Sequence, residues 1–143
     1  MKSRRRTPRL TTCFDDLAAA LRAWAKGLFT AEAAVELLIG HRSWLYRQDF
    51  LEIAVEFSQE ITGGAALVDF EAAARALEAG VLPCCGGEGR VLRIAASIAG
   101  GVPVDLGEVV TGLDENNAVL AAAAVLHAAG CRDLRMAAEG GSR

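Results

Sequence analysis

The sequence has no apolar run long enough to cross a membrane. Its longest such run covers residues 118–129 and contains His127, whereas a membrane-spanning helix needs roughly 20 apolar residues. No secretory signal is recognisable either, because Asp15 and Asp16 follow soon after the basic N-terminus and no apolar segment does. We therefore expect a cytoplasmic protein without a membrane segment, whose four cysteines stay reduced.

Strand patterns are also scarce. The only strand-like fragments cover residues 65–68 and 102–104, and both are too short to build an independent sheet. Apolar residues instead recur at steps of three and four, as at Phe14, Leu17 and Leu21, which is the spacing of one helix face. Alanine, the best helix former, supplies much of the 52% hydrophobic content. The sequence predicts an all-α fold, a compact bundle of six to seven short helices.

Capping residues and glycines indicate where these helices begin and end. The predicted helices cover residues 13–26, 31–39, 43–61, 70–79, 89–99, 106–113 and 115–129. Residues 84–89 hold three glycines in four positions and are predicted to form a loop. We expect a single domain over residues 12–143, with a possible sub-division at that loop.

Charge is distributed unevenly along the chain. Residues 1–9 hold five of the 15 basic side chains and no acidic one, so the other 134 residues carry ten basic and 18 acidic side chains, a net charge of −8. Residues 1–11 are predicted to be a flexible basic tail. Because an acidic body repels phosphate, any nucleic-acid contact would run through that tail. Its candidate residues are Arg4, Arg5, Arg6 and Arg9. The alternative is a solvated leader that binds nothing.

Carboxylates recur at helical spacing within the helix predicted over residues 43–61. The stripe consists of Asp49, Glu52, Glu56 and Glu60. Because carboxylates from facing helices hold metal ions in some helical enzymes, Glu52 and Glu56 are candidate metal ligands of a metal-dependent hydrolase. The neighbouring Glu32 and Glu36 are one residue too far apart for the Glu-x-x-Glu pair of helical pyrophosphatases, and no glutamate lies three residues before a histidine. These departures favour an ordinary solvated face.

Sulfur and imidazole ligands form a second candidate metal set. Cys84 and Cys85 are adjacent, and His127 lies four residues before Cys131, so one imidazole and three thiols are available for zinc. In structural zinc sites, two to four residues usually separate the paired cysteines, whereas Cys84 and Cys85 are adjacent. We therefore favour cysteines that pack as small apolar side chains, and we predict no cofactor.

Arginines and aromatic residues alternate most densely over residues 41–47. Arg42, Trp44, Tyr46 and Arg47 are candidates for a protein interface, where such residues are enriched, or for stacking on nucleic-acid bases. The alternative interpretation places Trp44 and Leu45 in the core, with Tyr46 and Arg47 covering its rim.

The last predicted helix, residues 115–129, is apolar nearly all round. This pattern implies burial on every side, either as the central helix of the bundle or in a subunit interface. With no catalytic signature in the sequence, the leading hypothesis is a non-enzymatic protein–protein interaction module that self-associates. The alternative is a nucleic-acid-associated regulatory or accessory protein that uses the tail and residues 41–47, and the weakest hypothesis is the metal-dependent hydrolase.

Overall fold

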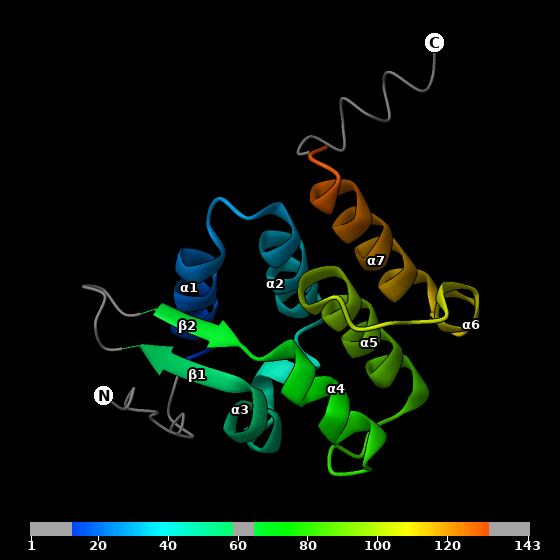
Figure 1. Ribbon diagram of the computed structural model, residues 1–143, viewed down its shortest axis with the longest axis horizontal. Coiled ribbons are helices and arrows are strands. Elements are labelled where there is room, and N and C mark those ends of the chain that lie inside the picture. The colour runs from blue at the N-terminus through cyan, green and yellow to red at the C-terminus, as the bar shows by residue number, and fades with distance from the viewer. Residues whose placement is uncertain (1–12, 59–64, 132–143) are drawn as a thin grey trace.

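A computed structural model describes residues 13–58 and 65–131 (Figure 1). The elements are α1 (Phe14–Ala25), α2 (Phe29–His41), the 3₁₀ helix η1 (Ser43–Tyr46), α3 (Gln48–Ala54), β1 (Val55–Ser58), β2 (Ala65–Val68), α4 (Phe70–Glu78), α5 (Gly86–Gly100), α6 (Leu106–Thr111) and α7 (Glu115–Ala128). The predicted all-α fold of six to seven short helices is confirmed. The predicted tail, with Arg4, Arg5, Arg6 and Arg9, lies outside the described residues.

Aspartate caps begin three of the helices where the sequence predicts them. Asp69, Asp105 and Asp114 each accept a hydrogen bond from the backbone N–H three residues further on, at 2.9, 3.2 and 2.7 Å. Each carboxylate satisfies an otherwise unpaired donor and also opposes the positive end of the helix dipole. These local contacts explain why the starts of α4, α6 and α7 are readable from the sequence alone.

A two-stranded hairpin replaces the second half of the helix predicted over residues 43–61. β1 pairs antiparallel with β2, with Val55 opposite Val68 and Phe57 opposite Ala66. The helix prediction is wrong over Val55–Ser58, which form β1. Residues 65–68, which are too short to build an independent sheet, form β2 by pairing with β1. Val55 and Phe57 alternate with Glu56 and therefore fit a strand as well as a helix, so pairing with β2 decided between the two.

The predicted loop over residues 84–89 is wrong beyond Cys85, because α5 begins at Gly86. Glu88 accepts a hydrogen bond from the Cys85 backbone N–H at 3.2 Å, which helps to cap the helix start. Gly89 is buried, and a β-carbon there would lie 3.3 Å from the Cys84 sulfur. Close packing thus explains this glycine better than a loop does.

The core lies between α2 and α5. Val35 and Leu38 of α2 and Val91 and Leu92 of α5 are fully buried, so the core includes residues from both sides of residues 84–89. Figure 1 shows α1 and the hairpin on one side of α2 and α7 on the other. Among the helices of the described ranges, none is long and apolar enough to span a membrane. The possible sub-division at residues 84–89 stays a prediction.

Candidate functional site

Helix α7 lies antiparallel to α2. Near the start of α7, Asn117 Oδ1 lies 3.0 Å from His41 Nδ1 at the end of α2. Near its end, His127 Nε2 lies 2.9 Å from Glu32 Oε1 at the start of α2. Between them, Gly40 gives Leu120 room to pack, since a β-carbon there would lie 2.8 Å from its Cδ2. These polar contacts at both ends fix which side of α7 faces the core.

Only one face of α7 is covered. Asn117, Ala121 and Ala124 are buried, and Leu120 and His127 are half-buried, at the spacing of one helix side. The opposite side is exposed, with Val119 at 63% and Val125 at 53%. We call this side the outer face of α7, and it consists of Ala118, Val119, Ala122, Val125, Leu126 and the cap residue Ala129. The prediction of a central helix buried on every side is therefore wrong.

Other exposed apolar side chains gather at the two ends of α7. Of the nine large apolar residues exposed in the described part of the chain, seven lie on α7, on α6 or at the start of α2. They are Leu28, Phe29, Leu106, Val110, Val119, Val125 and Leu126. The Phe29 ring lies 6.5 Å from the His127 ring between centroids, which places the start of α2 beside the end of α7. Apolar surface gathered in this way is typical of interaction sites.

Trp44, a predicted interface residue, belongs to the core instead. Its side chain is fully buried, its indole N–H donates to the Glu88 carbonyl at 2.9 Å, and its ring lies 5.5 Å from that of Phe50. Leu45 is buried as well. The interpretation that placed these two residues in the core is confirmed, and Trp44 has no surface to offer a partner.

Arg47 holds this part of the core together from its rim. Its guanidinium lies 4.6 Å above the Trp44 ring and donates to both carboxylate oxygens of Asp49, at 3.0 and 2.6 Å. It also donates to the Pro83 carbonyl at 2.7 Å. The Arg47 hydrogen bonds hold the pKa of Asp49 below its ordinary value. Each of its three nitrogens donates to a group within the chain, so Arg47 connects η1, α3 and the segment before α5.

Tyr46 and Arg42 lie at the surface and pack on Phe14. Tyr46 is 62% exposed, and its ring stacks on that of Phe14 with 4.9 Å between centroids. The Arg42 guanidinium lies 4.5 Å above the Phe14 ring, and its Nη2 donates to the Tyr46 hydroxyl at 3.2 Å. Of the four candidates in residues 41–47, these two are exposed, whereas Arg47 is half-buried and Trp44 is buried. Their contact with a protein or nucleic acid stays a prediction.

Arg42 has an unusual backbone conformation. With φ 73° and ψ −47°, it is the one residue other than glycine with positive φ in the described ranges. A β-carbon is strained there, whereas glycine is not. We expect Arg42→Gly to be more stable than Arg42→Ala by about 1 kcal/mol, the reverse of the usual order. Urea denaturation of both variants measures this difference, and a more stable alanine variant would contradict it.

The carboxylate stripe does not exist as predicted. Helix α3 ends at Ala54, so Glu52 is helical while Glu56 belongs to β1, and the two do not share a helix face. Glu60 lies outside the described residues. Glu52 accepts a hydrogen bond from Gln48 at 3.1 Å. The helix face that motivated a metal-dependent hydrolase is therefore absent.

The proposed zinc ligands divide between two elements. Cys84 and Cys85 precede α5, whereas His127 lies in α7 against Glu32, with Cys131 beyond its end. Burial raises the pKa of the Cys84 thiol above its ordinary value. Within residues 13–58 and 65–131, no group of three or more His, Cys, Asp or Glu side chains is arranged to hold a metal ion.

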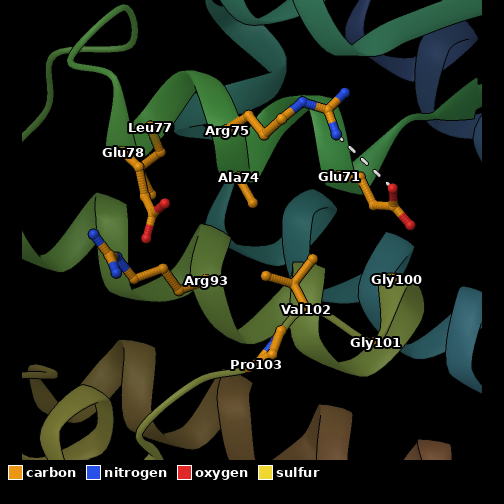
Figure 2. A pocket seen from close by; sticks show the side chains of 10 residues that line it. All are labelled: Glu71, Ala74, Arg75, Leu77, Glu78, Arg93, Gly100, Gly101, Val102 and Pro103. Atoms are coloured by element: carbon orange, nitrogen blue, oxygen red, sulfur yellow. Dashed lines mark ion pairs between the residues drawn. The ribbon is translucent and has the colours of Figure 1, made fainter.

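A hollow that the sequence did not suggest lies between α4, α5 and the segment after α5. It measures about 450 Å³, and Figure 2 shows Arg93 of α5 facing Glu78 of α4, with Val102 and Pro103 beside them. Arg75 and Glu71 form an ion pair of 3.8 Å at its edge. The lining contains no serine, cysteine or histidine, so it offers charged and apolar contacts rather than a nucleophile with a base.

Sequence reasoning missed this hollow because its walls are far apart along the chain.

A second hollow of about 480 Å³ shares Leu77, Arg93 and Pro103 with the first and reaches Cys84. There the Arg90 guanidinium donates to the backbone carbonyls of Glu108 and Val109, which fastens α6 to α5. Exposed arginines are ordinary on helices, so no sequence signal distinguishes Arg93.

Comparison with protein-family models, with curated proteins and with solved structures found no match. The function is therefore argued from the surface of the molecule.

Proposed function

We propose that the chain is a non-enzymatic protein–protein interaction module that self-associates through the outer face of α7. The carrying observation is the exposure of Val119, Val125 and Leu126 on a helix whose other side already packs on the core. Apolar helix surface left in water is unfavourable, and a second apolar surface removes it from water. In this proposal the protein acts in the cytoplasm, where its four free cysteines stay reduced.

The exposed side chains supply a favourable free energy of moderate size. Fully burying a valine or leucine side chain stabilises by about 1.5–3 kcal/mol. Two copies bring six such partly exposed side chains from α7 alone, so the gain is several kcal/mol, against an association cost of about 4–15 kcal/mol. Association in the micromolar range needs a net gain of about 8 kcal/mol, so the α7 side chains alone are too few, and the proposal requires the apolar residues at the ends of α7 in the same contact.

Sedimentation velocity of the 143-residue chain over a concentration series tests the proposal. We expect the average mass to rise from that of a 15.0 kDa monomer towards twice that value as the concentration passes through the micromolar range. A chain that stays monomeric up to about 50 µM would contradict self-association.

A further inference from the structure

We propose that two copies pair through α7 in an antiparallel, two-fold arrangement centred on Ala122. This inference rests on the proposed function, because it specifies the geometry of that association. Two-fold pairing uses the same patch on both copies, so the patch must be complementary to itself. The outer face of α7 meets that requirement in its side-chain sizes, in its charges and in the placement of its flanking apolar residues.

The residue sizes on the two sides of Ala122 complement each other. In an antiparallel pair centred on Ala122, a residue a given number of positions before Ala122 lies opposite the partner's residue the same number of positions after it. Leu126 then lies opposite Ala118 of the partner subunit, and Val119 lies opposite Val125 of the partner subunit. A large side chain meets a small one in the first pair, and two valines meet in the second. This alternation of large and small residues is what interdigitating helices need.

The middle of the face also allows close approach. Ala118, Ala122 and Ala129 present only methyl groups. Because successive helix residues are rotated by about 100° about the axis, Val119 and Val125 lie about 60° to either side of Ala122. Helix axes can then come as near as about 8 Å. A parallel pair would set Leu126 against Leu126 and leave a gap between the two copies of Ala118, so it fits less well.

Charge favours the same orientation. Asp114 and Glu115 begin α7, and no charged side chain follows on its outer face as far as Ala129. A parallel pair would bring both acidic starts together, and like charges repel. In the antiparallel pair the two acidic starts lie at opposite ends, separated by roughly 20 Å along the helix axis.

The area needed for a stable dimer also points to this arrangement. A standard interface buries about 800 Å² on each partner, more than one face of a 14-residue helix provides. Antiparallel pairing brings the end of α7, where Leu28 and Phe29 are exposed, towards the start of α7 in the partner subunit. Leu106 and Val110 are exposed on α6 next to that start. In the proposed pair these residues enlarge the contact at both of its ends, where the start of α2 in one copy approaches α6 in the other, which favours a second copy as the occupant.

Site-directed disulfide formation tests the orientation. The background is the 143-residue chain with serine in place of Cys13, Cys84, Cys85 and Cys131. One cysteine is then introduced by Ala122→Cys, Ala118→Cys or Leu126→Cys and oxidised with copper phenanthroline. We expect Ala122→Cys to form a covalent dimer by itself. The other two variants should form it only when mixed with each other, because in separate samples their cysteines lie about 12 Å apart along the axis, beyond the reach of a disulfide.

The outcomes separate this inference from the proposed function. Covalent dimers of Ala118→Cys alone and Leu126→Cys alone would show a parallel pair and overturn the inference while self-association stands. Dimers in sedimentation without a bond at any of the three positions would place the contact on another face, which also overturns it. A monomeric wild-type chain would overturn both. If the serine background fails to fold, the same substitutions in the native chain, with disulfides mapped by peptide mass spectrometry, give the same discrimination.

Discussion

We expect Ala122→Glu to abolish the proposed self-association, with the dissociation constant raised at least about 100-fold. Ala122 is exposed at the middle of the outer face of α7, so the substitution leaves the monomer intact. In the proposed pair it sets two carboxylates directly opposite each other. Like charges in that position cost several kcal/mol, and each 1.4 kcal/mol is a tenfold change in affinity. Sedimentation velocity of the wild type and the variant measures the change.

A matched control separates the effect of the position from that of the residue type. Ala23 is an exposed alanine on α1, away from the outer face of α7, so Ala23→Glu should associate as the wild type does. An equal mixture of Ala122→Glu and Ala122→Lys should regain association, because the opposite charges attract. Unchanged association of Ala122→Glu, or an equal loss in Ala23→Glu, would show that α7 is not the contact surface.

Trp44→Ala lowers the free energy of unfolding by about 3–5 kcal/mol. The fully buried indole contacts Phe50, supports the Arg47 guanidinium and donates to the Glu88 carbonyl. Alanine leaves a cavity that these groups cannot fill, and it removes a donor from the partly buried Glu88 carbonyl. Urea denaturation of the wild type and the variant measures the loss.

Tyr46→Ala is the natural control, since this neighbouring aromatic residue is largely exposed. We expect it to cost only about 1 kcal/mol, from the lost stacking on Phe14 and the lost Arg42 hydrogen bond. If Trp44→Ala does not fold, Trp44→Phe, which keeps an aromatic ring and loses the N–H donor, provides the comparison with a smaller loss. Equal stabilities of Trp44→Ala and Tyr46→Ala would contradict the buried position of Trp44.

The sequence predicted those features that depend on neighbouring residues. Helix starts at Asp69, Asp105 and Asp114 could be read because a capping carboxylate acts over three residues. The hairpin could not, because Val55 and Phe57 fit either a helix or a strand until β2 lies beside them. The start of α5 was missed for a related reason, since Gly89, which disfavours a helix locally, packs closely against Cys84 from outside the helix.

The sequence by itself determined the all-α class, three capped helix starts and the concentration of basic charge in residues 1–9. Only the tertiary structure decided that Trp44 is in the core and that α7 has an exposed side. An amphipathic helix shows its buried face in its residue pattern, but α7 is apolar on both faces. Its orientation therefore depends on distant contacts, the pairs of Asn117 with His41 and of His127 with Glu32. These contacts bring α7 onto α2 and leave Val119, Val125 and Leu126 to the solvent.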